Sequence, residues 1–168
     1  MSNISASLVK ELREKTGAGM MDCKNALTEN NGDIESSVDW LRTKGLAKAA
    51  KKSGRVASEG LIAISSSESF SVIVEVDSET DFVARNESFQ DVANTISQLG
   101  LLSSNIDDLK IQKIENKDVN VEEYITEMIS SIGENINLRR MVRFESSNTN
   151  IASYIHGQVS EGLSLIHI

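Results

Sequence analysis

The sequence predicts an α+β protein in which helices come first and an antiparallel sheet, with helices packed on one face, follows. Residues 4–45 repeat apolar side chains at helical spacing. Residues 70–76 instead alternate with a period of two, as a half-buried strand does. Because strand-like runs then flank helix-like ones, an α+β layer architecture is favoured.

Residues 4–45 are expected to form three short helices. Gly17 stands where a glycine ends a first helix, Asn31-Gly32 makes a turn, and Asp33 is a natural N-cap for the third. Trp40 is expected to cover the small core. The apolar positions of the three helices are Leu8, Val9, Leu12, Met20, Cys23, Ala26, Leu27, Ile34, Val38 and Leu41. This core of about 40 residues is marginal, so the unit should be easily perturbed.

A basic segment, residues 46–55, is predicted to link this unit to a second domain. It is rich in alanine and lysine and has no proline, so it can be partly helical. The cations between 42 and 55 are Arg42, Lys44, Lys48, Lys51, Lys52 and Arg55, with no acidic residue among them. Without interleaved aromatics, a stacking platform for single-stranded nucleic acid is not expected. A solvated linker helix and a docking surface for an acidic partner both remain open.

The second domain is predicted to span residues 56–157. Residues 61–64 and 70–76 are expected to pair as a hairpin, and a helix should follow from about 81 to 100. Asn120 and Glu123 have the spacing of a capping box at the start of another helix. Two more strands are expected over 138–145 and 150–156.

Composition indicates a cytoplasmic protein. The net charge of −8 argues against general nucleic-acid binding, which requires phosphate neutralisation. No apolar run approaches the length of about 20 residues that spans a bilayer, and no secretory signal is visible at the N-terminus. Cys23 is the sole cysteine, which fits a reducing compartment, and it is expected to be a small buried residue.

No catalytic, metal or cofactor constellation is found in the sequence. His156 and His167 have no cysteine or acidic neighbours at metal-ligand spacing. Residues 16–19 lack the lysine and preceding strand of a phosphate loop. Residues 77–88 lack the glycine and the bidentate glutamate of a calcium loop. We therefore expect no enzyme, no bound metal and no cofactor.

The junction at residues 80–86, Thr-Asp-Phe-Val-Ala-Arg-Asn, is the most informative stretch of the chain. It follows a strand-like run and opens a helix-like one, and Thr80 or Asp81 is a suitable cap. A bulky Phe82 beside the cap is unusual. It either staples the helix start to the core or projects as an apolar anchor for a partner.

This heptapeptide resembles the signature of the elongation factor Ts family, the nucleotide-exchange factors of elongation factor Tu in bacteria and organelles. Residues 12–27, LREKTGAGMMDCKNAL, resemble the family's N-terminal motif. Further matches occur in family order at Ala49-Ala50-Lys51-Lys52, Glu59-Gly60, Ile132-Gly133-Glu134-Asn135-Ile136, Arg139-Arg140 and Ser153-Tyr154-Ile155-His156-Gly157. Residues 65–70 and 101–119 match weakly.

The resemblance implies a fold, a partner and a mechanism. It implies a three-helix domain, residues 1–45, similar to a ubiquitin-associated domain. It also implies that Asp81 and Phe82, flanked by Thr80 and Val83, press into the nucleotide domain of elongation factor Tu, dislocate its magnesium ion and so promote GDP release. The wider contact surface would include Met20, Met21, Lys24, Lys51, Ile132, Gly133 and His156. It implies neither direct nucleotide binding nor a membrane, and a bacterial cytoplasm or, alternatively, an organellar matrix.

Residues 158–168 depart from the basic, glycine-rich continuation expected of the family. They are expected to be an atypical, poorly packed tail of a C-terminally truncated chain, which puts family-like homodimerisation in doubt. Two other functions remain open. A ubiquitin-associated-type module for another protein would leave the 80–86 signature unexplained, and an RNA-binding protein would have to overcome the net charge of −8.

Overall fold

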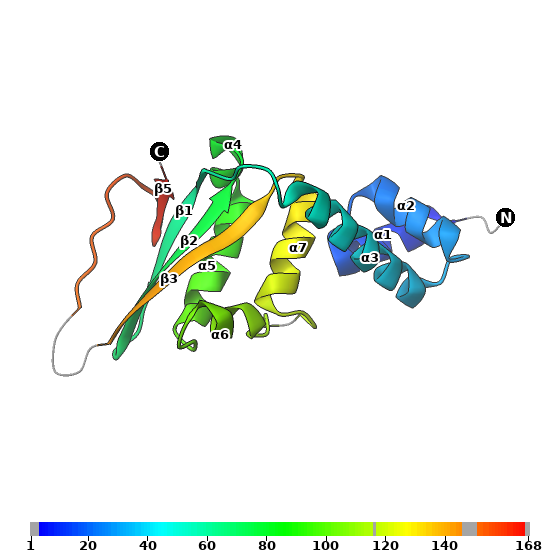
Figure 1. Ribbon diagram of the computed structural model, residues 1–168. Coiled ribbons are helices and arrows are strands. Elements are labelled where there is room, and N and C mark those ends of the chain that lie inside the picture. Colours follow the sequence, from blue (N-terminus) through cyan, green and yellow to red (C-terminus); the bar gives the residue numbers. More distant parts are fainter. Residues whose placement is uncertain (1–3, 116, 146–150, 167–168) are drawn as a thin grey trace. The chain divides into compact units, whose positions relative to one another are not determined.

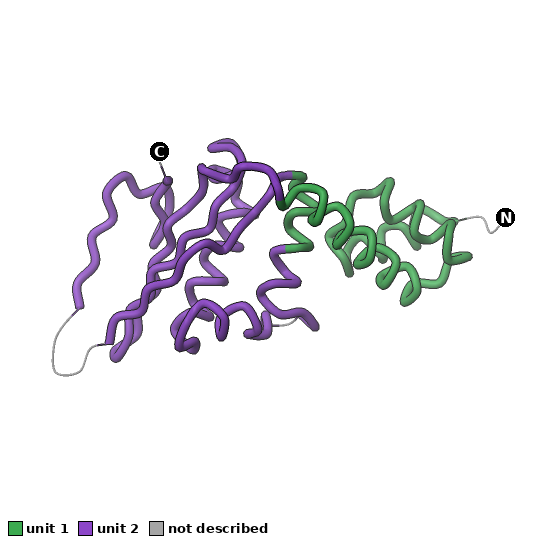
Figure 2. Tube along the Cα trace, viewed as in Figure 1, with its two compact units in different colours: residues 1–53, 126–133 green, residues 54–125, 134–168 purple. Residues whose placement is uncertain are grey.

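A computed structural model describes residues 4–115, 117–145 and 151–166. The fold is α+β, as predicted (Figure 1). The chain forms two compact units, Met1–Ser53 with Thr126–Gly133, and Gly54–Ile125 with Glu134–Ile168 (Figure 2). The predicted limits of domain and linker, 1–45, 46–55, 56–157 and 158–168, remain a prediction.

Unit 1 contains helices α1 (Ala6–Thr16), α2 (Met20–Glu29) and α3 (Ile34–Lys52). The predicted helix ends are confirmed. Gly17 adopts a φ of 66°, which glycine tolerates without strain, and its backbone N–H donates a hydrogen bond to Arg13 O. The Asp33 side chain accepts a bond of 2.8 Å from Ser36 N. The third helix is not short, because it continues through much of the segment predicted as a linker.

The core of unit 1 is small and apolar. Val9, Leu12, Cys23, Ala26 and Leu27 are buried. The partly buried side chains packed against them, Trp40 among them as predicted, are Ile4, Leu8, Ala18, Ile34, Val38, Trp40 and Leu41. Burial raises the pKa of the Cys23 thiol, which disfavours the reactive thiolate and fits a packing role.

Unit 2 is built on a five-stranded antiparallel sheet of order β3-β2-β1-β5-β4. The strands are β1 (Glu59–Ser66), β2 (Phe70–Ser78), β3 (Ile136–Glu145), β4 (Gln158–Ser160) and β5 (Leu163–Ile166). The β1–β2 hairpin and β3 are confirmed. The strand predicted over 150–156 is wrong, because the described residues 151–156 contain no strand.

The expectation of a poorly packed tail is also wrong over the described residues 158–166. Strand β5 adds to the free edge of β1, with Leu165 opposite Leu61 and Leu163 opposite Ala63. Leu163 is fully buried. The alternation Leu-x-Leu that looked unpaired in the sequence is thus the inward-facing side of a strand whose partner lies about a hundred residues earlier, and local pattern does not identify such a partner.

Among the described residues, four helices belong wholly or in part to unit 2. They are α4 (Asp81–Ala84), α5 (Glu87–Gly100), α6 (Ile106–Ile111) and α7 (Val121–Ile132). The single helix predicted over 81–100 is in fact two, since the Asn86 side chain accepts from Ser88 N and starts a new helix. Helix α6 was not predicted. The capping box is confirmed by reciprocal bonds of 3.0 and 2.9 Å between Asn120 and Glu123.

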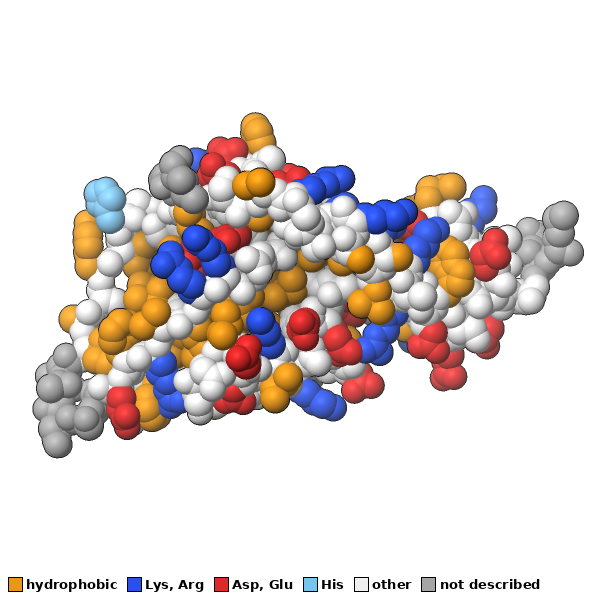
Figure 3. Space-filling model, viewed as in Figure 1, with side chains coloured by type: hydrophobic (Ala, Val, Ile, Leu, Met, Phe, Trp, Pro, Cys, Tyr) orange, Lys and Arg blue, Asp and Glu red, His pale blue; other side chains and the backbone are white. Residues whose placement is uncertain are grey.

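Helix α5 lies on one face of the sheet, behind the strands in Figure 1. Its buried stripe at helical spacing is Phe89, Val92, Ala93 and Ile96, which face the buried valines of β2. On the opposite face hydrophobic side chains gather over the strands (Figure 3). Val142 and Phe144 of β3 are exposed hydrophobic residues. None of the helices in the described part of the chain has the length and apolar character of a membrane crossing.

Candidate functional site

Helix α4 is a single turn held at both of its ends. Thr80 caps it, with its hydroxyl 3.5 Å from Val83 N and its carbonyl accepting from Ala84 N at 3.3 Å. Ala84 at the other end is fully buried. A helix this short does not persist alone, so the surrounding contacts must define it.

Phe82 projects from this turn with 82% of its surface exposed. The alternative that it staples the helix start to the core is therefore wrong. Asp81 and Val83 on either side are partly buried. Asp81 lies 3.7 Å from Arg85, and both side chains are about half exposed, so this ion pair contributes little stability.

The loop before α4 is tied to the segment that follows α7. The Glu134 carboxylate accepts two hydrogen bonds from Thr80, one from its amide at 3.0 Å and one from its hydroxyl at 2.7 Å. Glu79 Oε1 accepts from Asn135 N at 2.6 Å, and Asn135 Nδ2 donates to Arg55 O at 2.9 Å. Glu134 and Asn135 belong to the motif at 132–136, but their role was not foreseen, because nothing local connects them to Thr80.

In unit 1, the predicted residues Met20, Met21 and Lys24 lie on the first turns of α2. All three are exposed, with 61% of Met20 and 66% of Met21 accessible. Two adjacent exposed methionines form an adaptable apolar surface of the kind that protein partners use. Asp22, which follows Met21, pairs with Lys48 of α3 at 2.8 Å.

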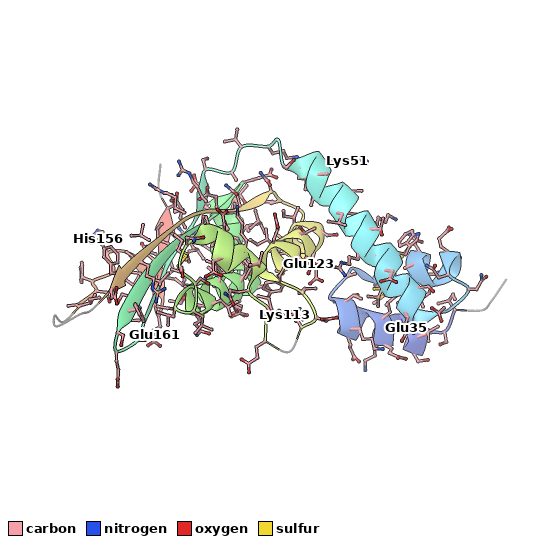
Figure 4. The ribbon with its side chains drawn as sticks, turned by 60° about the horizontal axis from the view of Figure 1, so that its bottom comes forward. Glu35, Lys51, Lys113, Glu123, His156 and Glu161 are labelled. Atoms are coloured by element: carbon pink, nitrogen blue, oxygen red, sulfur yellow. The ribbon has the colours of Figure 1, made fainter. Side chains whose placement is uncertain are left out.

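The basic segment is less free than its sequence suggests. Lys48 pairs with Asp22, Arg55 lies 3.5 Å from Glu79, and Lys52 donates to the carbonyl of Ile129 at 3.4 Å. Lys51 is exposed near the end of α3 (Figure 4). Most of the cations thus have structural partners within their own units.

The remaining predicted residues are distributed over both units. Ile132 and Gly133 end α7 in unit 1, where Gly133 turns the chain with a φ of 95°. His156 is exposed in the segment between β3 and β4 of unit 2 (Figure 4), and its carbonyl accepts from Ser164 Oγ at 2.9 Å.

A charged cluster on β2 and β3 joins the buried carboxylates of Glu75 and Asp77 to two arginines that are at least half exposed. Arg139 and Arg140 donate hydrogen bonds to Glu75, and Arg139 Nε lies 4.0 Å from Asp77. Burial would raise the pKa of Glu75, but the bonds from the two arginines outweigh it and hold that pKa below its ordinary value. Burial, reinforced by the charge of Glu75, raises the pKa of Asp77 to about 6.

This cluster supports a structural role. Its arginine bonds account for the Glu75 charge, and it lies within the sheet. Among the described residues, no group of three or more His, Cys, Asp or Glu side chains is placed to hold a metal ion. An open polar hollow of about 310 Å³ is lined by Glu87, Gln90, Asp91, Asn94, Ser160 and Glu161, and it contains no nucleophile paired with a base.

Comparison with known proteins places the chain in a family. The sequence profile described as Elongation factor TS matches residues 79–166. Elongation factor Ts of Methylorubrum populi is 56% identical over 169 aligned residues, which cover 100% of this chain and 55% of that protein. Elongation factor Ts of Rickettsia typhi is 56% identical over 166 residues, covering 99% of this chain and 53% of the relative. The chain belongs to the elongation factor Ts family, and it spans about half the length of the curated relatives it matches.

Proposed function

We propose that this chain is a guanine-nucleotide exchange factor that binds elongation factor Tu carrying GDP and promotes GDP release. Phe82 would be the apolar wedge and Asp81 its polar companion, with Thr80 and Val83 completing the contact. The wedge would distort the site that holds magnesium and phosphate in the partner. GTP would then rebind to the emptied site.

The observation that carries this proposal is the exposure of Phe82 on an anchored helical turn. An apolar ring held out into water gains nothing for folding, whereas it gains free energy when a partner buries it. A wedge also has to keep its position while it presses on the partner. The Thr80 cap and the buried Ala84 fix the two ends of α4. Membership of the family supports elongation factor Tu as the partner.

The mechanism needs differential binding and no chemical reaction. A protein that binds the nucleotide-free partner more tightly than the GDP-bound one weakens GDP binding by the same factor. No bond is made or broken, so we propose that the chain is not an enzyme in the chemical sense and does not itself bind nucleotide. We further propose a bacterial cytoplasmic location.

The exposed residues Met20, Met21, Lys24 and Lys51, together with Ile132, Gly133 and His156, are proposed as the wider contact surface for elongation factor Tu. Only Lys51 of the basic segment is offered as a docking charge without a competing partner in the described contacts. Because Lys48 and Arg55 pair with acidic side chains instead, the segment offers few cations to RNA, which favours the protein partner.

The test is the release of fluorescent GDP from elongation factor Tu, with and without this chain. We expect the chain to accelerate release and Phe82→Ala to lose at least about tenfold of that acceleration, a typical loss for an interface anchor. Glu68→Ala, at an exposed position of unit 2, is the control. Equal acceleration by Phe82→Ala and by the unmodified chain would refute the wedge.

A further inference from the structure

We propose that Glu134 and Asn135 are positioning residues that hold the loop 79–83 in the form that displays Phe82. The proposal rests on the proposed function, since it concerns how the wedge is held. Neither residue was among the predicted site residues, and neither is proposed to contact elongation factor Tu. Both act through Thr80 and Glu79.

Glu134 controls the cap of α4. Its two carboxylate oxygens engage both donors of Thr80, the amide and the hydroxyl, at 3.0 and 2.7 Å. Because the hydroxyl hydrogen is committed to Glu134, the oxygen lone pairs are left to face Val83 N, the bond that caps the helix. A carboxylate that accepts two bonds in this way is a stronger and more directional anchor than a neutral group.

Asn135 and Glu79 form a second connection between the same two segments. Glu79 accepts from the Asn135 amide at 2.6 Å, while the Asn135 side chain donates to the Arg55 carbonyl at 2.9 Å. Asn135 is buried, with 8% of its surface exposed. Residues 134–135 and 79–80 therefore bind each other reciprocally, each pair supplying one carboxylate and one backbone amide.

The anchoring segment is itself fixed in the sheet. Strand β3 begins at Ile136, which pairs with Ser78 at the end of β2. The hydrogen bonds between residues 79–80 and 134–135 therefore lie at the end of the β2–β3 ladder, where both strands leave the sheet. Phe82 is exposed and the Asp81–Arg85 pair is half exposed, so the ties to 134–135 and the burial of Ala84 are what fix this turn.

The experiment compares Glu134→Ala, Glu134→Gln and the control Glu68→Ala in the full chain. Glu134→Gln keeps one acceptor oxygen, so it should retain one of the two bonds and rescue part of the effect. We expect Glu134→Ala and the unmodified chain both to unfold cooperatively. We also expect Glu134→Ala to slow GDP release from elongation factor Tu about tenfold, with Glu134→Gln in between. Amide exchange at Val83 and Ala84 should accelerate about tenfold or more in Glu134→Ala, while α5 amides keep their protection.

A double-mutant cycle with Phe82→Ala separates positioning from other roles. If Glu134 acts through Phe82, Glu134→Ala should slow release by less than about twofold once Phe82 is already alanine. Additive losses would overturn the proposal, as would unchanged GDP release or unchanged exchange at Val83 in Glu134→Ala. A Phe82→Ala chain as active as the unmodified one would instead remove the proposed function, and this inference with it.

Discussion

Phe82 and Phe89 lie on either side of Asn86 and have opposite environments. Phe82 is 82% exposed on the single turn of α4, whereas Phe89, in the first turn of α5, is fully buried. The break at Arg85 and Asn86 turns the chain between them, so one helical run becomes a display turn followed by a core helix. The comparison teaches that the same side chain is exposed or buried according to where a cap restarts the helix.

The largest effect is expected at Phe89. Phe89→Ala leaves a cavity between α5 and the sheet and should lower the free energy of unfolding by about 3–5 kcal/mol. Phe82→Ala should change it by less than about 0.5 kcal/mol, because an exposed ring contributes little to folding. Urea unfolding of both variants checks the contrast. Similar losses for the two would break the comparison.

Leu163 extends the comparison to the end of the chain. It is fully buried opposite Ala63, so Leu163→Ala should lower the free energy of unfolding by about 2–4 kcal/mol. Glu68→Ala, at an exposed position of the same unit, is the control. Thermal and urea denaturation measure both, and an unperturbed Leu163→Ala would restore the expectation of a loose tail.

The next prediction concerns the ionisation of Asp77, on the strand that leads into α4. Its folded pKa of about 6 exceeds its ordinary value of 3.8, so the folded state holds a proton that the unfolded state releases first. This group's contribution to stability therefore falls as pH rises from about 4 to about 6 and stays constant above that window. Asp77→Asn should gain about 1–3 kcal/mol more stability at pH 7.5 than at pH 4.

Urea unfolding at several pH values, for Asp77→Asn and the unmodified chain, gives this difference. Glu75 has the opposite trend, because its lowered pKa stabilises the fold above its unfolded pKa. Its charge acts on Asp77, so the two complete pH profiles are compared rather than one pair of values. A gain that does not depend on pH would show that Asp77 ionises normally.

The smallest effect is expected at the cap that separates the two phenylalanines. Asn86→Ala removes the bond of 2.9 Å to Ser88 N and should cost about 1 kcal/mol, while Asn86→Ser keeps a capping oxygen and should cost less. Amide exchange should accelerate first in the opening turn of α5. If it accelerated equally throughout α5, the cap would have no local role.

Local chemistry made part of this structure predictable. The helix ends at Gly17, Asp33 and Asn120 were predicted because a cap depends on residues within one turn of the chain. The alternation in β2 similarly predicted its buried valines. These features need no knowledge of distant residues.

The features that the sequence did not reveal depend on distant contacts. The pairing of β5 with β1 and the hydrogen bonds that Thr80 donates to Glu134 join residues 54 or more positions apart. The sequence left Phe82 open between staple and anchor, because both suit an aromatic residue beside a helix cap. Only the packing of the whole unit, which leaves 82% of Phe82 exposed, separates the two.

The most direct test of the account is the affinity of this chain for elongation factor Tu in two states. Linkage requires a nucleotide-exchange factor to bind the nucleotide-free form more tightly than the GDP form. The ratio of the two Kd values is the factor by which it weakens GDP binding. We predict a ratio well above about tenfold for the unmodified chain and a ratio reduced towards one for Phe82→Ala, measured by titration calorimetry. Equal affinity for both forms, or a ratio that Phe82→Ala leaves unchanged, would contradict the account.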